Sequence, residues 1–246
     1  MQVEVWSDFA CPFCYIGKRK FEAALEQFPN KNEVEVIYRS FELDPNAPKD
    51  VDYDVHDMLA SKYGMSREQA KGMNDQMVGQ AQSVGLTYHF DTMVVTNTFD
   101  AHRLTQFAAK HNKMHEMTER LLKAYFTESK HIGDHETLAE LAAEVGLDKN
   151  EVAAMLAGDD YTKEVRSDEQ TASQLGARGV PFFVIDRKYG ISGAQSSEVF
   201  LQAVQKAWEE VKPLTVLNAP GMDDAGEACV DGVCAAPSGE VPKTNK

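Results

Sequence analysis

The sequence predicts an α/β fold with a large α-helical insertion and a flexible C-terminal tail. The first indication is a strand, helix and strand pattern at the N-terminus. The second is a long middle segment with helical periodicity, and the third is an apolar strand pattern that returns after Gly179. With 246 residues, of which 43% are hydrophobic, the chain is long enough to bury a substantial core in one domain with an insertion.

The N-terminal segment is expected to contain two short strands separated by a helix. Val3 and Val5 alternate with polar residues as in a first strand, and residues 34–38 do so as in a second. Between them, Cys11 and Pro12 open a segment whose apolar residues recur with helical spacing. This order places the start of a helix shortly after the end of a strand.

The middle segment, residues 44–176, is expected to form a series of helices because it carries repeated helix start signals. Residues 66–69 and 148–151 both fit the capping-box pattern, in which side chains satisfy the free amides of a first helical turn. An apolar stripe over residues 138–145 is followed by Gly146, a typical C-terminal cap.

Strand character returns in residues 180–185, and residues 189–192 are the expected hairpin partner. Residues 196–211 have the spacing of a closing amphipathic helix, and the remainder is rich in Pro, Gly and acidic residues with few large apolar ones. The chain therefore divides into a discontinuous α/β domain of residues 1–43 and 177–216, a helical insertion of residues 44–176, and a flexible tail of residues 217–246.

The composition disfavours several classes of partner. The chain has 39 acidic and 25 basic residues, so its formal net charge of -14 repels nucleic acid and anionic lipid surfaces. The N-terminal segment lacks the pattern of a secretory signal, and no stretch is suited to spanning a bilayer. We therefore expect a cytoplasmic protein, and in that reducing compartment the four cysteines indicate chemistry rather than structural disulfides.

The pair Cys11 and Cys14 is the strongest functional signal. At the N-cap of a helix, with Pro12 at the first helical position, Cys11 would lie at the positive end of the helix dipole, which stabilises a thiolate. Cys14 would lie one turn deeper, so the spacing supplies an attacking thiolate at Cys11 and a resolving thiol at Cys14. Such exchange requires neither a metal nor an organic cofactor.

The sequence leaves two questions open at this point: whether the cysteines bind zinc, and which isomer one X-Pro peptide bond adopts. Cys-x-x-Cys is also a common zinc-ligand spacing, and Cys229 with Cys234 could complete a set of four sulfurs, although zinc pairs usually lie on turns rather than at the start of a long helix. For the Val180–Pro181 peptide bond, local sequence alone favours trans, because cis bonds are a minority at X-Pro.

The order of strand, Cys-Pro-x-Cys helix, strand, helical insertion, Gly-Val-Pro-Phe-Phe strand and closing helix resembles the DsbA family over residues 2–212. The segments VEVWSDFACPFCYIG, SFELDP, NTFDAHRL and GARGVPFFVIDRKYGISGAQ are most similar to the FrnE branch of cytoplasmic DsbA-like proteins. The resemblance implies a thioredoxin-like fold interrupted by helices, with Cys11 as nucleophile and Cys14 as resolving thiol. It also implies that Val180 and Pro181 form a cis-proline segment facing them, where the Val180 backbone binds substrate.

The same resemblance implies a thiol-disulfide oxidoreductase or isomerase, and we expect protein or small-molecule disulfides as its substrates. We also expect it to draw on a cytosolic thiol reductant and to be a monomer or homodimer. Pro12 and Phe13 would contact the substrate. Periplasmic members carry a histidine between the cysteines, and Phe13 can neither donate a hydrogen bond nor add positive charge there. We therefore expect a less oxidising couple than theirs.

Two further functions compete with this one. Kappa-type glutathione transferases and chromene-carboxylate isomerases share the fold, but they typically have serine at the position of Cys11. The second is a chaperone-like protein that binds zinc or unfolded clients and senses redox state through its cysteines. Eight of the ten methionines lie between Met58 and Met155, where ordinary core packing is favoured over an adaptable client groove.

The tail carries the second cysteine pair. Between Cys229 and Cys234, an Asp-Gly sequence flanked by valines favours a two-residue hairpin, in which the two cysteines would be directly opposite and close to disulfide reach. We interpret them as an auxiliary redox pair on a flexible tether, and the alternative is a disordered tail with two incidental thiols.

Overall fold

The structure is a computed structural model that describes residues 1–211, 229–230 and 233–234. The chain divides into two units, Met1–Lys212 and Pro213–Lys246. None of the described helices is long and apolar enough to cross a membrane.

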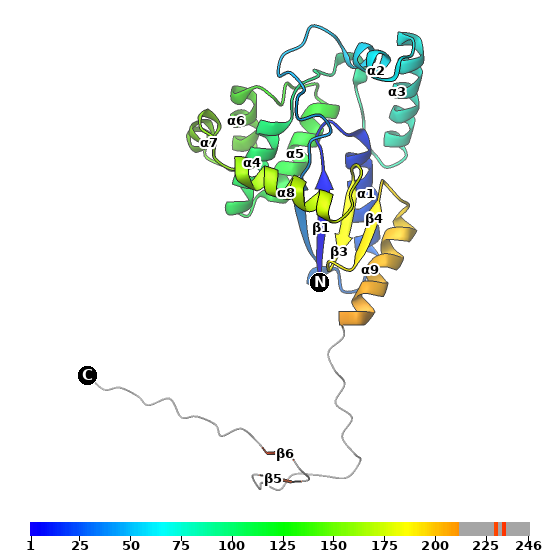
Figure 1. Cartoon of the computed structure of the whole chain (residues 1–246), viewed down its shortest axis with the longest axis vertical. Coiled ribbons are helices and arrows are strands. Elements are labelled where there is room, and N and C mark those ends of the chain that lie inside the picture. Colours follow the sequence, from blue (N-terminus) through cyan, green and yellow to red (C-terminus); the bar gives the residue numbers. More distant parts are fainter. Residues whose placement is uncertain (212–228, 231–232, 235–246) are drawn as a thin grey trace, which may run out of the picture. The chain divides into compact units, whose positions relative to one another are not determined.

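A four-stranded sheet forms the centre of the first unit (Figure 1). Its order is β2-β1-β3-β4, with β1 parallel to β2 and antiparallel to β3, and β3 antiparallel to β4. The strands confirm the elements predicted at both ends of this unit: β1 (Gln2–Ser7), β2 (Glu35–Ser40), β3 (Phe182–Ile185) and β4 (Tyr189–Ser192). A short 3-10 helix, η1 (Lys31–Glu33), which was not predicted, precedes β2.

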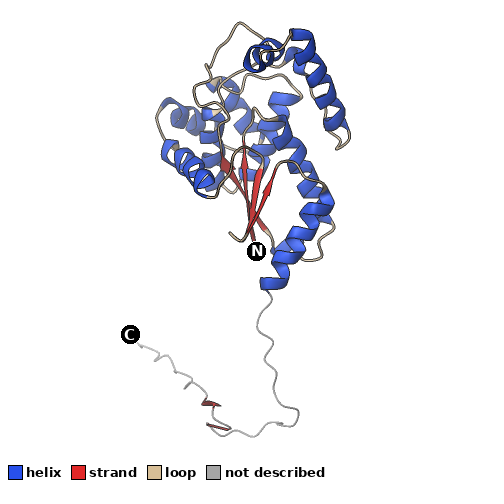
Figure 2. Cartoon of the chain, turned by 45° about the vertical axis from the view of Figure 1, so that its right-hand side comes forward, coloured by secondary structure: helices blue, strands red, loops and turns tan. Residues whose placement is uncertain are grey.

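Helices α1 (Pro12–Glu26) and α9 (Ser197–Val211) cover one face of the sheet. Because successive strand residues point to opposite faces, Val3, Val5 and Phe183 share this side and pack with α1 and α9. Figure 2 shows the strands with helices on both sides. Burial on both faces explains why the β3 sequence is continuously apolar rather than alternating.

Helix α8 (Thr162–Gln174) covers the other face. Trp6 and Phe182 point to this side and pack with Ala172. The Trp6 indole Nε1 donates a hydrogen bond of 2.8 Å to the carbonyl oxygen of Asp168, so this buried ring has its polar atom satisfied.

The segment between β2 and β3 is helical, as predicted, and has its own core. Ser66 forms the expected capping box with Gln69, and Asp148 accepts hydrogen bonds from the amides of its first turn. The remaining elements of this segment are α2 (Val55–Tyr63), α3 (Arg67–Gln82), η2 (Phe90–Thr92), α4 (Phe99–Lys110), α5 (Met114–Phe126), α6 (His135–Glu144) and α7 (Lys149–Ala157).

Helix α1 joins the two cores. Tyr15 and Ile16, in its first turns, belong to the core of the helical segment, whereas Phe21 and Ala24 belong to the core of the sheet. The N-terminus of α1 therefore lies where the two parts of this unit meet. The domain boundaries at residues 43 and 177 stay predictions, because residues Met1–Lys212 form one compact unit.

In the second unit, β5 (Cys229–Val230) and β6 (Val233–Cys234) form a two-stranded antiparallel ladder. Its register pairs Cys229 with Cys234 and Val230 with Val233, which is the register expected for the hairpin. The rest of the predicted flexible tail, residues 217–246, lies outside the described residues.

Candidate functional site

Cys11 and Cys14 lie at the start of α1, where the sequence placed them. Cys11 is the N-cap residue, with extended backbone angles, and Pro12 occupies the first turn. The Cys11 amide donates to the Asp8 carbonyl at 3.1 Å, and the Cys14 amide donates to the Cys11 carbonyl at 3.0 Å. No acidic residue lies in the first turn, so the helix end keeps its positive potential beside Cys11. Both cysteines are free thiols.

The two thiols have different environments. Burial, followed by interaction with Cys11, raises the pKa of the Cys14 thiol well above its usual value. The Asp8 backbone amide points at the Cys14 sulfur, with a distance of 3.4 Å between N and Sγ. Burial outweighs this contact, so the protonated form of Cys14 is favoured, which fits the role of a resolving thiol.

The Val180–Pro181 segment lies beside Cys11, and its peptide bond is cis. The distance from Cys11 Sγ to the Val180 carbonyl oxygen is 3.5 Å, although 169 residues separate them in the chain. The close approach depends on Gly17 in α1, because a Cβ atom at that position would lie 3.0 Å from Pro181 Cγ. The structure therefore brings together the cysteine pair and the proline segment, and adds Gly17 as the contact between them.

Sequence reasoning missed Asp8, which supports the loop before Cys11. The Asp8 side chain is 2% exposed, and its carboxylate accepts hydrogen bonds from the Leu43 amide (2.8 Å), the Thr98 hydroxyl (2.7 Å) and the Ala10 amide (3.3 Å). His102 Nε2 lies 3.4 Å from the same carboxylate. Burial opposes ionisation, but His102 and these hydrogen bonds together lower the Asp8 pKa.

The Asp8 cluster gives the buried His102 a structural role. Thr98 and His102 belong to the segment NTFDAHRL and reach Asp8 from the start of α4. Their contacts fix the loop whose backbone touches both cysteines.

A second residue missed by sequence reasoning is Tyr88, whose hydroxyl donates a 2.8 Å hydrogen bond to the Pro12 carbonyl. Its ring packs against Tyr15 and Phe126 in the core of the helical segment. Burial, and then the nearby Tyr15 and cysteine charges, raise the Tyr88 pKa, so the hydroxyl stays a proton donor. Tyr88 thus ties the first turn of α1 to the helical segment.

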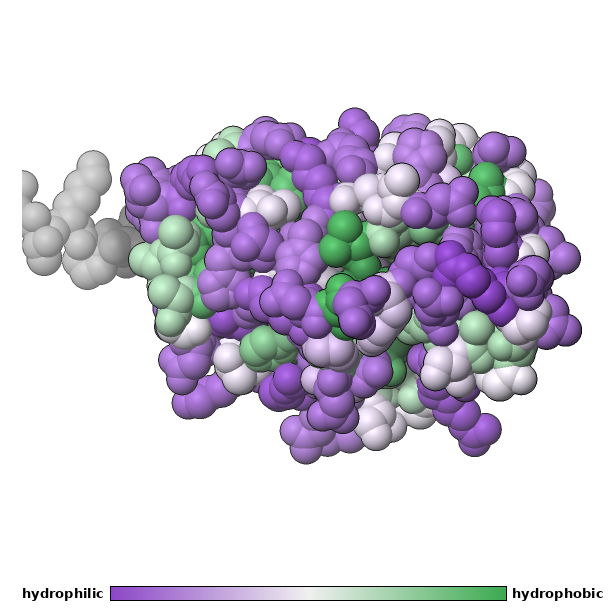
Figure 3. Space-filling view, turned by 90° about the horizontal axis from the view of Figure 1, so that it is seen from above, coloured by the Kyte–Doolittle hydropathy of each residue, from purple (hydrophilic) through white to green (hydrophobic). Residues whose placement is uncertain are grey.

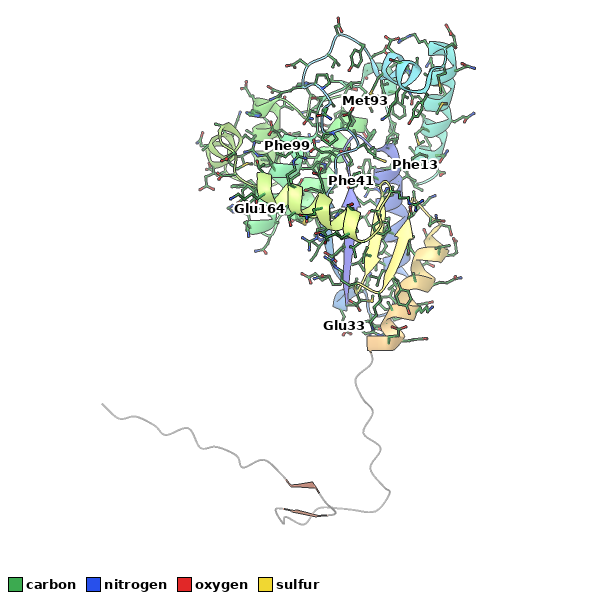
Figure 4. The ribbon with its side chains drawn as sticks, in the orientation of Figure 1. Phe13, Glu33, Phe41, Met93, Phe99 and Glu164 are labelled. Atoms are coloured by element: carbon green, nitrogen blue, oxygen red, sulfur yellow. The ribbon has the colours of Figure 1, made fainter. Side chains whose placement is uncertain are left out.

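A cavity of about 790 Å³ opens beside the cysteines, a size suited to binding an organic group or a peptide segment. Cys11, Pro12 and Phe13 line one end of it, and residues of α2 and α3 line another. Phe13 is 42% exposed, so its ring is available to a ligand. Figure 4 shows Phe13 and Met93, both lining residues, on the side of the molecule occupied by α2 and α3.

The methionines divide between the two arrangements considered from the sequence. Met117 and Met155 are buried core residues, as the favoured interpretation predicts. Four others line the cavity, and of these Met93 is also a buried member of the same core: Met58, Met73, Met77 and Met93.

Cys229 and Cys234 belong to the second unit and are paired in register there. Among the described residues, His, Cys, Asp and Glu side chains form no group of three or more that could hold a metal ion.

Comparisons with known proteins are consistent with this geometry. A family model described as a DSBA-like thioredoxin domain matches residues 2–205. The uncharacterized protein YwbO of Bacillus subtilis is 31% identical over 205 residues, which cover 83% of this chain and 96% of that protein.

Two solved structures are also similar. A probable DsbA oxidoreductase from Streptomyces coelicolor is 47% identical, with a TM-score of 0.83 over 97% of this chain and 100% of that one. The cytosolic disulfide reductase DsbM from Pseudomonas aeruginosa has a TM-score of 0.60 over 86% of this chain and 100% of that one. At 16% identity, the second likeness concerns the fold alone.

Proposed function

The chain belongs to the family of DSBA-like thioredoxin domains, which confirms the predicted thioredoxin-like fold, and we propose that it is a thiol-disulfide oxidoreductase acting on protein disulfides. The observation that carries the proposal is the geometry of Cys11. This thiol lies at a helix N-terminus, 3.5 Å from the Val180 carbonyl, beside a second thiol kept protonated and in the wall of a cavity.

The reaction begins with attack of the Cys11 thiolate on one sulfur of a substrate disulfide. An S–S bond forms between Cys11 and that sulfur, the substrate S–S bond breaks, and the other substrate sulfur leaves as a thiolate that takes up a proton. Cys14 then loses its proton and attacks the Cys11 sulfur, which releases the second substrate thiol. Two electrons pass from the Cys11–Cys14 dithiol to the substrate, and the enzyme is left with a Cys11–Cys14 disulfide.

Other parts of the site bind the substrate. The Val180 backbone lies beside the Cys11 sulfur, where it is placed to pair with the main chain of a bound substrate. Pro12 and Phe13 line the cavity and contact the groups that flank the disulfide. A thiol reductant of the cytoplasm returns the oxidised pair to the dithiol, and this direction suits a reducing compartment.

The tail pair has the auxiliary role in this proposal. The ladder register places the Cys229 and Cys234 backbones opposite each other, within the range in which a disulfide can form. In its dithiol form this pair would reduce the Cys11–Cys14 disulfide by the same two-step exchange, and would itself become the disulfide that the external thiol reduces.

Reduction of insulin by dithiothreitol tests the proposal. We expect the wild type to accelerate the reaction, Cys11→Ser to abolish the acceleration, and a double variant, Cys229→Ser with Cys234→Ser, to slow turnover without abolishing it. A wild type that leaves the uncatalysed rate unchanged would overturn the proposed function, whereas full activity of the double variant would remove only the auxiliary role of the tail.

A further inference from the structure

The apolar surface of the first unit is concentrated around the cavity beside Cys11. Six large hydrophobic residues are exposed among the described residues, and all but Val199 line this cavity: Phe13, Leu43, Tyr53, Tyr63 and Met73. Figure 3 looks from above onto the end of the molecule where α2 and α3 lie, and shows apolar surface near the centre of a largely hydrophilic face. In a chain with a net charge of -14, such a gathering marks a binding surface.

Two buried residues of the cavity wall, Asn74 and Tyr125, each have a side-chain polar atom without a partner among the described residues. Asp8, Thr96 and Thr98 also line the cavity, but internal hydrogen bonds occupy their side chains. Asn74 and Tyr125 line it as well, with 6% and 3% of their surface exposed.

The orientation of Asn74 follows from a chain of contacts behind it. His56 is 2% exposed, and its Nε2 lies 3.0 Å from the Asp91 carboxylate, while its Nδ1 lies 3.0 Å from Asn74 Nδ2. The carboxylate can only accept, so His56 Nε2 carries the hydrogen, and in the neutral ring Nδ1 accepts from the Asn74 amide nitrogen. Lys71 Nζ donates to the same Asp91 oxygen, Oδ1, at 3.2 Å.

This chain of contacts uses the nitrogen of the Asn74 side chain and leaves its carbonyl oxygen, Oδ1, without a partner in the described part of the molecule. This oxygen is not among the fully buried polar atoms that lack a partner, so it is accessible from the cavity and can accept a hydrogen bond from a ligand that carries a donor. The Tyr125 hydroxyl, likewise without a hydrogen-bond partner among the described residues, supplies a donor in the same wall.

We propose that the cavity binds a peptide segment of the disulfide substrate, with large apolar side chains beside its cysteine, and that Asn74, oriented by His56 and Asp91, accepts a hydrogen bond from a main-chain N–H of that segment. This inference rests on the proposed function and names its substrate class. A peptide matches the wall because each of its amides offers both a donor and an acceptor. The four cavity-lining methionines are adaptable side chains that can repack around different apolar residues.

The test is equilibrium binding of fluorescent peptides to the full-length protein, measured by anisotropy. Serine replaces the central cysteine of each peptide, so the readout needs no thiol exchange. The flanking residues are either Leu and Phe or Gly and Ser at equal net charge. We expect the apolar peptide to bind at least tenfold more tightly, and equal affinities would overturn the proposal.

The variants give the assay its controls. Met73→Glu places a charge in the cavity wall and should weaken binding at least tenfold, whereas Val199→Glu, the same change on an exposed apolar residue away from the cavity, should stay within twofold. If both variants bind as the wild type does, the site is elsewhere. Dimerisation of the wild type that Met73→Glu abolishes would assign the face to a second copy and would also overturn the proposal.

Asn74→Leu removes the acceptor oxygen while keeping side-chain size, and it also removes the amide that donates to His56. We expect binding about fivefold to tenfold weaker, and a single position at which N-methylation of the peptide weakens binding to the wild type but not to this variant. If no position behaves in this way, Asn74 does not recognise the main chain. Insulin reduction measured in parallel separates the two proposals, because a wild type that binds the peptides yet leaves insulin reduction uncatalysed contradicts only the proposed function.

Discussion

Replacing Asp8 with asparagine should destabilise the protein strongly, because the Asp8 carboxylate is buried and accepts several hydrogen bonds. The two shortest come from the Thr98 hydroxyl and the Leu43 amide, on different oxygens. An asparagine side chain keeps one acceptor oxygen but presents an NH2 group to the donors around the other.

The expected loss of stability follows from the number of hydrogen bonds that the substitution removes or weakens. A buried donor left without an acceptor costs about 1–3 kcal/mol, and the remaining hydrogen bonds each weaken by about 0.5–1 kcal/mol on losing a charged acceptor. With three bonds remaining, the total is about 2.5–6 kcal/mol, which agrees with the roughly 3–5 kcal/mol measured when one partner of a buried ion pair is removed. For a unit of this size, it corresponds to a Tm lower by about 5–24 °C.

Urea unfolding at pH 7 measures the effect, with Asp52→Asn as the control, since that substitution makes the same chemical change on an exposed residue. The Asp8 backbone also contacts both cysteines, so the reduction potential of the Cys11–Cys14 pair should shift in Asp8→Asn but not in the control. A free energy of unfolding within 1 kcal/mol of the control, on the scale of ordinary surface substitutions, would refute the role given to the buried cluster.

Three further predictions concern the same site. Gly17→Ala should lower insulin-reduction activity several-fold, because the new Cβ pushes Pro181 away from the cysteines. This loss is expected even though alanine stabilises a helix interior by about 0.5–1 kcal/mol relative to glycine. Unchanged activity would show that the close contact has no functional role. Tyr88→Phe should cost about 0.5–1.5 kcal/mol in urea unfolding through the lost hydrogen bond to the Pro12 carbonyl, and no loss of stability would mean that this bond contributes nothing. The pKa of Asp8 is lowered in the folded state, so its contribution to the free energy of unfolding should be present above pH 4, near the unfolded pKa of about 3.9, and be lost as the pH falls further. The stability difference between wild type and Asp8→Asn should therefore shrink below about pH 4. A constant difference from about pH 7 to pH 3 would contradict the ionised state assigned to Asp8.

The sequence was informative where the deciding interactions are local. The alternation in β1, the Cys-Pro start of α1 and the capping box at Ser66 each depend on residues within a few positions of one another, and each is found as predicted. The fold class followed from the order of such local elements together with the family resemblance.

The residues that hold the site in place could not be predicted in the same way, because their roles depend on contacts between distant parts of the chain. His102 lies 94 residues from Asp8, and nothing in the helical spacing of α4 shows that its ring meets a buried carboxylate. From the local sequence, Gly17 is expected only to weaken its helix slightly. The close packing of Pro181 against it, which explains why a residue without a side chain is needed there, is visible only in the structure. Periodicity likewise shows that a methionine is buried or half-buried, but not whether it faces a core or a cavity.

Trapping the mixed disulfide shows directly whether Cys11 is the nucleophile. Cys14→Ser, which keeps Cys11 but removes the resolving thiol, is incubated with a peptide disulfide and analysed by peptide-mapping mass spectrometry. The account predicts one peptide adduct on Cys11 within the first unit, and none there when Cys11→Ser, which keeps Cys14, is treated in the same way. An adduct on Cys14 in the second variant, or an unmodified Cys11 in the first, would contradict it.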